Sequence, residues 1–198
     1  MGLQTTGRVI LASASPRRIE LLHQLGLRFE IVTSGVDEDF REGESPREHV
    51  LRLAGAKAGV VSRLQPDAWV LGADTIVVID GEILGKPGSP AEAVAMMGKL
   101  SGREHRVFTG FSVLSAERGA AVSEAVESSV IFRKLGDDEA AWYAATDEPY
   151  DKAGAYAVQG LGAFFIREIR GSYTNVMGLP LCEVVDVMKK LQILSFSG

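Results

Sequence analysis

The chain has 198 residues, 46% of them hydrophobic and 24% charged, and its formal net charge is −5 at pH 7. This composition excludes a largely disordered chain and provides enough apolar material for a core. The acidic balance and the lack of any block of basic residues argue against nucleic acid as the main partner, although free nucleotides need only a small cationic cluster.

Cys182 is the single cysteine, so an internal disulfide and a multi-cysteine zinc site are excluded. The N-terminal apolar run is too short for a signal peptide or a membrane span, and we expect a cytoplasmic protein without a membrane partner.

Strands alternate with helices in the first half of the chain. In chain order we expect a strand over 8–13, a helix over 16–25, a strand over 29–32, a helix over 46–63 and a strand over 69–73 that ends at Asp74. A hairpin follows, with strands over 76–79 and 82–84, because the dipeptide Asp80-Gly81 favours a type I′ turn.

The second half predicts further strands and helices. In chain order they are a helix over 90–98, two long antiparallel strands over 105–115 and 121–132, a helix over 138–145 capped by Asp137 or Asp138, a glycine-rich loop over 150–162, a strand over 164–169 and a helix over 176–191. Cys182 lies in an apolar stretch of that last helix and is expected to be buried. The whole pattern predicts an α/β fold with a mixed sheet flanked by helices. We expect one domain over 1–198, in which about 105–145 could form a smaller lobe beside a ligand cleft.

Three Ser-Pro pairs begin helices, and the first differs from the other two. Ser45 and Ser89 are each followed three residues later by a glutamate, the pattern of a capping box. In Ser15-Pro16-Arg17-Arg18 the glutamate is replaced by Arg18, so two guanidinium groups lie beside free N–H donors and a positive dipole end. Such a helix start, directly after a buried strand, favours a bound phosphate. The alternative is that both arginines pair with acids elsewhere in the fold.

Acidic residues at two places are candidates for metal and proton chemistry. Asp74 could bind a divalent cation or accept a proton from water; the alternative is an aspartate that caps a turn. Glu38, with Asp37 and Asp39, offers the hard oxygen ligands that suit Mg²⁺ or Mn²⁺, unless these residues only form a solvated loop. The histidines lie far apart without ligand spacing, so we expect structural or surface roles for His23, His49 and His105.

Cationic side chains and an amide could complete a nucleotide site. Lys86 lies between Gly85 and Pro87, which fix its backbone. Lys57 lies among small helical residues, which suggest close packing. The alternative for either is an exposed lysine, which these positions alone favour. The segment Tyr150-Asp151-Lys152-Ala153-Gly154-Ala155-Tyr156 has the mixed character of a binding loop. Gln159 follows it, and its amide could contact the edge of a base or simply lie at the surface. Walker A and G-x-G-x-x-G patterns are missing, so the set favours metal-assisted attack of water on a nucleotide phosphate.

Several of these residues lie in segments that resemble the motifs of the Maf family. The matching segments are Leu11-Ala12-Ser13-Ala14-Ser15-Pro16-Arg17-Arg18 with Leu21-Leu22, Gly72-Ala73-Asp74-Thr75, Leu84-Gly85-Lys86-Pro87, the loop 150–156, and Asn175-Val176-Met177-Gly178-Leu179-Pro180. They follow the family's order along nearly the whole chain. The resemblance implies a fold similar to that of the inosine triphosphate pyrophosphatases, an elongated curved mixed sheet with two lobes around a cleft.

The resemblance also implies a hydrolase that cleaves nucleoside triphosphates between the α- and β-phosphates and releases pyrophosphate. Such enzymes are cytoplasmic, need a divalent cation and are often homodimers. Asp74 matches the family's proton acceptor. The positions that handle phosphate and metal match Ser13, Arg18, Glu38, Lys57 and Lys86. Glu38 and Asp74 are the implied metal ligands, and the expected substrate-binding set also includes Ser15, Asp151 and Lys152.

Substrate preference is implied by Arg17, Thr75 and Gln159. They match the group of the family that resembles enzymes for dTTP and UTP, whereas the group that prefers 7-methyl-GTP has Asp-Gln and a glutamate at the last two positions. Two alternatives stay open. One is a non-enzymatic regulator of cell division that acts through a partner. The other is an enzyme for purine triphosphates such as ITP or XTP.

Overall fold

The computed structural model describes residues 2–197, which divide into two compact units. The first unit is formed by the described residues up to Asp74, by Thr109–Val126 and by the described residues from Gly178 on; the second is formed by Thr75–Phe108 and Glu127–Met177. Three long strands contribute residues to both units: β4 (Trp69–Ile79), β6 (Glu104–Ser115) and β7 (Ala120–Phe132).

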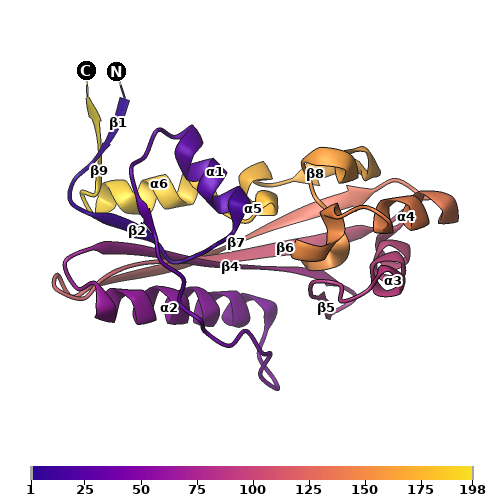
Figure 1. Ribbon diagram of the computed structural model, residues 1–198, viewed down its shortest axis with the longest axis horizontal. Helices are drawn as coiled ribbons and strands as arrows, with labels where there is room; N and C mark the ends of the chain where they lie inside the picture. Colours follow the sequence, from indigo (N-terminus) through magenta and orange to yellow (C-terminus); the bar gives the residue numbers. More distant parts are fainter. Residues whose placement is uncertain (1, 198) are drawn as a thin grey trace. The chain divides into compact units, whose positions relative to one another are not determined.

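The first unit contains the parallel part of the sheet. Its remaining elements are β1 (Gly2–Thr5), β2 (Val9–Leu11), α1 (Pro16–Gln24), β3 (Glu30–Ile31), α2 (Pro46–Leu64), α6 (Leu181–Lys190) and β9 (Leu194–Ser197). Strand β2 pairs in parallel with both β3 and β4. Helix α2 lies on one side of these strands and α1 and α6 lie on the other (Figure 1). The pairing of β1 with β9 brings the two ends of the described chain together.

The second unit contains the antiparallel hairpin with the Asp80-Gly81 turn and most of the short helices. Its remaining elements are β5 (Glu82–Leu84), α3 (Pro90–Leu100), α4 (Asp137–Ala144), the 3-10 helices η1 (Glu148–Asp151), η2 (Ala153–Ala155) and η3 (Gly160–Phe165), β8 (Ile166–Arg170) and α5 (Tyr173–Met177). The core of this unit includes Met97, Phe132, Tyr143 and Phe165. Asp80 and Gly81 both have positive φ, at 52° and 81°, which confirms the expected turn between β4 and β5.

The main sheet has the strand order β3-β2-β4-β6-β7-β8, with β5 paired to β4, and a separate two-stranded sheet joins β1 to β9. Parallel and antiparallel pairs occur in the same sheet, and helices flank it. The expected α/β class with a mixed sheet is therefore confirmed.

Two glycines set how closely α2 approaches the sheet. A Cβ atom at Gly72 on β4 would lie 2.4 Å from the carbonyl oxygen of Ala54 and 2.7 Å from the backbone nitrogen of Ala58. A Cβ at Gly110 on β6 would lie 2.4 Å from the carbonyl oxygen of Val50. Because these neighbours are backbone atoms of α2, a side chain at either position would push the helix away. The close contact brings residues of α2 next to residues of β4.

One prediction about β4 is wrong: the strand does not end at Asp74. It continues without interruption to Ile79, because its first half pairs with β2 and its second half pairs with β5. Asp74 therefore lies in the middle of a strand, where it is 6% exposed, rather than in a turn.

The C-terminal region and one cap also differ from expectation. The helix expected over 176–191 is two helices, α5 and α6, because Gly178 adopts a φ of 113° and Pro180 is the N-cap of α6. Cys182 is exposed, not buried, since α6 turns Val184 and Val187 to the core instead. Helix α4 begins after Gly136, so neither expected aspartate caps it.

A buried histidine lies in the core of the second unit. The His105 ring packs edge-on against Phe132 and Tyr156, and its Nε2 atom is 2.8 Å from the Tyr156 hydroxyl. Burial lowers the pKa of His105 to about 4. The expected structural role of this residue agrees with that environment.

Because His105 is held in its neutral form, the protein should lose stability in acid. The unfolded imidazole titrates near pH 6.5, roughly, so below that pH the unfolded chain binds more protons than the folded one. The contribution of neutral His105 is complete above about pH 6.5 and is lost as the pH falls toward about 4, by up to about 3 kcal/mol. Urea unfolding across this range should show a steeper acid loss for the wild type than for His105→Gln, which cannot titrate. If the free energies of unfolding of the two proteins fall equally with decreasing pH, His105 is not the cause of the acid loss of stability.

Candidate active site

The start of α1 differs from the other two Ser-Pro helix starts, as expected. Ser45 forms a complete capping box with Glu48, and the Ser89 hydroxyl accepts a hydrogen bond from the backbone N–H of Glu92. Ser15 makes no side-chain cap bond, and the first turn of α1 contains no acidic residue. The backbone N–H of Ser15 donates instead to the Ser13 hydroxyl, at 3.2 Å. The N-terminus of α1 thus lacks the acidic cap that neutralises α2 and α3.

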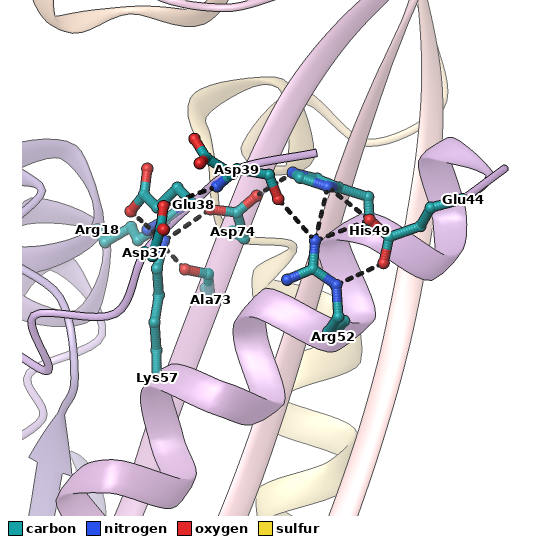
Figure 2. Close-up of polar contacts among 10 residues, drawn as sticks. All are labelled: Arg18, Asp37, Glu38, Asp39, Glu44, His49, Arg52, Lys57, Ala73 and Asp74. Atoms are coloured by element: carbon teal, nitrogen blue, oxygen red, sulfur yellow. Dashed lines mark hydrogen bonds and ion pairs between the residues drawn. The ribbon is translucent and has the colours of Figure 1, made fainter. Parts of the chain in front are cut away.

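Arg18 turns from α1 into the interior of the first unit. Its guanidinium donates to the carbonyl oxygens of Ala73 at 2.9 Å and Gly178 at 2.8 Å, and to the Ser13 hydroxyl at 3.1 Å. Burial lowers the pKa of Arg18, and the negative charge of Asp74 opposes this shift. The arginine brings a positive charge close to Asp74 (Figure 2). Arg17, next to it, is half-buried.

Lys57 joins the two acidic candidates. Its ammonium lies 2.7 Å from Oδ1 of Asp74 and 2.6 Å from Oε1 of Glu38. Figure 2 shows Lys57 reaching from α2 to this point, with Asp74 on β4 beside it. Lys57 is only 7% exposed, so the sequence reading of a lysine in close packing is confirmed and the exposed alternative is wrong. The Glu38 side chain, by contrast, remains 54% exposed and accessible from solvent.

A second polar group, His49 with its partners, lies on the other side of Asp74, although only a structural or surface role was expected for this histidine. Nε2 of His49 is 3.9 Å from Oδ2 of Asp74, and Nδ1 of the same ring is 3.0 Å from Glu44. Arg52 holds Glu44 through two nitrogen–oxygen contacts (Figure 2). The hydrogen bonds to Arg52 lower the pKa of Glu44 to about 2. Asp74 is therefore surrounded by Arg18, Lys57 and His49.

The other expected site residues lie in the second unit. Thr75 follows Asp74 on β4, and because successive strand residues point to opposite faces, it does not face α2. The exposed Lys86 follows Gly85, whose carbonyl oxygen accepts a hydrogen bond from the backbone N–H of Gly154 at 3.0 Å. This bond ties the lysine-bearing turn to the loop that the sequence analysis singled out.

Within that loop, Lys152 donates to the carbonyl oxygen of Glu148 at 2.6 Å and pairs with Asp151. Gln159 is half-buried at the start of η3. Glu148 organises the segment, because its carboxylate accepts from the Tyr143 hydroxyl and from the backbone N–H groups of Leu161 and Gly162. Glu148 is not among the expected site residues, because its only signal in the sequence is an acidic residue before Pro149.

The donor set suits a hard cation that also binds phosphate. Among residues 2–197, no group of three or more His, Cys, Asp or Glu side chains is arranged as a protein-only metal cage. Glu38 and Asp74 nevertheless converge on one cationic group, the Lys57 ammonium. Magnesium is typically bound through one or two carboxylates together with substrate phosphates and water. Two convergent carboxylates fit that mode of binding.

Comparison with known proteins places the chain in a family. Residues 8–191 match the family model described as Maf, Maf-like protein. The chain is 58% identical over 193 residues to a protein of Syntrophus aciditrophicus named dTTP/UTP pyrophosphatase, covering 98% of this chain and 94% of that protein. A protein of the same name from Geotalea uraniireducens is 51% identical, over 96% of this chain and 97% of its own length. The chain therefore belongs to the Maf family, which confirms the resemblance seen in its motifs.

Among solved structures, the Staphylococcus aureus Ham1 protein aligns with a TM-score of 0.44 and 16% identity, over 63% of this chain and 71% of that one.

Proposed function

We propose that the protein is a nucleoside triphosphate pyrophosphatase that converts dTTP and UTP to the monophosphate and pyrophosphate. Relatives that bear this name are similar to the chain over nearly its full length. The observation that carries the proposal is the meeting of Asp74 and Glu38 at the buried Lys57 ammonium, beside the buried Arg18. The site thus places carboxylates, which can accept a proton and bind a cation, next to fixed positive charges that can bind phosphate groups.

In the proposed reaction, water attacks the α-phosphate and the bond to the bridging oxygen of the β-phosphate breaks. Asp74 accepts the proton that the water gives up, and the electron pair of the broken bond leaves on pyrophosphate. Lys57, Arg18 and Lys86 carry the positive charge that stabilises the leaving group as its negative charge develops. The uncapped N-terminus of α1, with Ser13, Ser15 and Arg17, supplies further donors for phosphate oxygens.

A divalent cation, Mg²⁺ or Mn²⁺, belongs to this proposal. Glu38 and Asp74 are the residues that would hold it. When bound, such a cation neutralises and orients phosphate oxygens. The charge of Lys57 at the same carboxylates keeps them at one point before any cation binds.

The remaining roles concern recognition and cellular context. Arg17, Thr75 and Gln159 select a pyrimidine base, and Asp151 with Lys152 completes the substrate-binding loop. No helix within residues 2–197 is long and apolar enough to cross a membrane. The proposed enzyme acts in the cytoplasm, as a homodimer, on a free nucleotide rather than on nucleic acid.

The test is a nucleotide panel with Mg²⁺ or Mn²⁺: dTTP, UTP, CTP, dCTP, GTP, ITP and 7-methyl-GTP, scored for monophosphate and pyrophosphate. Selective cleavage of dTTP and UTP is the expected result. Equal cleavage of ITP or 7-methyl-GTP would leave the reaction standing and overturn the base preference. Failure to cleave any nucleotide would overturn the enzyme and favour a regulator of cell division.

A further inference from the structure

The segment that carries Glu38 has no regular secondary structure. Strand β3 ends at Ile31 and α2 begins at Pro46, and the residues between them form neither helix nor strand. Glu38 is more than half exposed on this segment, yet its carboxylate lies 2.6 Å from a lysine that is almost fully buried. A flexible segment would lose entropy on holding a carboxylate in that position, so other contacts must restrain it.

Arg52 supplies such contacts from α2. Its Nε and Nη2 atoms bind the two carboxylate oxygens of Glu44 at 2.5 and 2.7 Å, and Nη2 also donates to the carbonyl oxygen of Asp39 at 3.0 Å. One rigid guanidinium therefore binds the segment at two places: at Asp39, next to Glu38, and at Glu44, near the C-terminal end of the segment. The planar guanidinium of arginine can form these hydrogen bonds simultaneously, which the single ammonium group of lysine cannot do.

His49 adds a third contact from the preceding turn of α2. Its ring stacks on Phe40, with centroids 4.0 Å apart and an interplanar angle of 19°, and its Nδ1 atom is 3.0 Å from Glu44. Residues 39, 40 and 44 are thus all attached to one face of the helix that also carries Lys57. The Arg52 guanidinium and the Glu44 carboxylate are mostly withdrawn from solvent, at 21% and 10% exposure. That burial distinguishes the pair from an ordinary surface ion pair.

We propose that Arg52 is a positioning residue that holds the Glu38 segment against α2, so that the Glu38 carboxylate stays at the Lys57–Asp74 pair. Arg52 touches neither Lys57 nor Glu38 in this role; it acts through the Asp39 carbonyl and through Glu44. The kinetic consequence rests on the proposed pyrophosphatase function. The ordering of the segment does not, and it can be measured separately.

The first test is amide hydrogen exchange of the wild type, Arg52→Gln, Arg52→Lys and Arg63→Gln. Arg63 is an exposed arginine of the same helix, so Arg63→Gln removes the same charge without touching the segment. Exchange in residues 37–44 should become roughly tenfold faster or more in Arg52→Gln, because the charge-assisted hydrogen bonds between Arg52 and Glu44 are lost. Arg52→Lys should be intermediate, and Arg63→Gln should match the wild type. Unchanged exchange in Arg52→Gln would overturn the proposal. If Arg52→Gln does not fold, Glu44→Gln tests the same ion pair by changing its other partner.

The second test asks whether Arg52 acts through Glu38. With dTTP or UTP as substrate, Arg52→Gln should lower kcat on the order of 10- to 100-fold, the size expected when a catalytic group is displaced by about 1 Å. In a Glu38→Gln background the same substitution should cause no further loss, since the displaced carboxylate is already gone. An equal loss in both backgrounds would overturn the proposal and assign Arg52 a general structural role. If the wild type cleaves no nucleotide, the proposed function fails, while the exchange result still decides whether Arg52 orders the segment.

Discussion

Replacing Asp74 with asparagine should lower kcat by roughly 10²- to 10⁴-fold, the range typical for loss of a positioned general base. The substitution keeps the shape of the side chain but removes its ability to take a proton. Lys57 retains Glu38 as a charged partner, so the fold should persist. The measurement is steady-state release of pyrophosphate from dTTP, with circular dichroism and the unfolding midpoint recorded on the same samples.

The matched control for this change is Asp80→Asn. Asp80 lies in the turn between β4 and β5 and pairs with Arg103 at the surface, so the same chemical change there should leave kcat within about twofold of the wild type. A wild-type rate for Asp74→Asn would show that another group accepts the proton. A variant that does not fold would leave the role to be read from Asp74→Glu, which keeps the base but moves it and should lower kcat while keeping the protein folded.

Replacing Gly72 with alanine should lower the free energy of unfolding by about 3 kcal/mol or more, at the upper end of overpacking effects. The added Cβ would meet the backbone of Ala54 and Ala58 at 2.4 and 2.7 Å, and helix backbone cannot rotate away as a side chain can. Helix α2 would have to move as a body and carry Lys57 away from Asp74. The variant should therefore also lose pyrophosphate release at temperatures where it remains folded. Urea denaturation provides the first measurement and the nucleotide assay the second.

Gly59→Ala is the matched control, because it makes the same change on α2 at a position where a Cβ has space. A Cβ there would lie 3.5 Å from the end of the flexible Arg63 side chain and 4.0 Å from Leu114, which are ordinary contacts. Within a helix alanine is favoured over glycine, so this variant should be neutral or more stable by up to about 1 kcal/mol. Similar unfolding free energies for the two variants would mean that α2 and β4 are not packed as closely as described.

The elements with strong local signals could be predicted from the sequence. The three Ser-Pro helix starts and the Asp80-Gly81 turn depend on neighbouring residues, and each occurs as expected. The end of β4 could not be predicted in this way. Whether a strand continues past Asp74 depends on its pairing with β5, and the polar residue within it is tolerated because charged side chains of α1 and α2 surround it.

The charged residues at the centre of the candidate site could be predicted from the sequence, but the residues that hold them in place could not. Glu38 and Lys57 were singled out, and in the structure the Lys57 ammonium contacts both the Asp74 and the Glu38 carboxylates. His49 and Arg52 were not, because each is an ordinary helix residue whose partners are residues of an irregular segment. Spacing along a helix shows that two side chains share a face, but it does not show which loop covers that face.

The absence of a side chain at Gly72 also fixes the register of β4 against α2. A slip of one residue would turn Leu71 or Ala73 toward the Ala54 carbonyl, where a Cβ does not fit. The same slip would exchange the faces of Asp74 and Thr75 and leave a hydroxyl, which is a poor base at neutral pH, opposite Lys57. A position without any functional group thus determines which of two adjacent polar residues faces Lys57 on α2 and which faces the other side of the sheet.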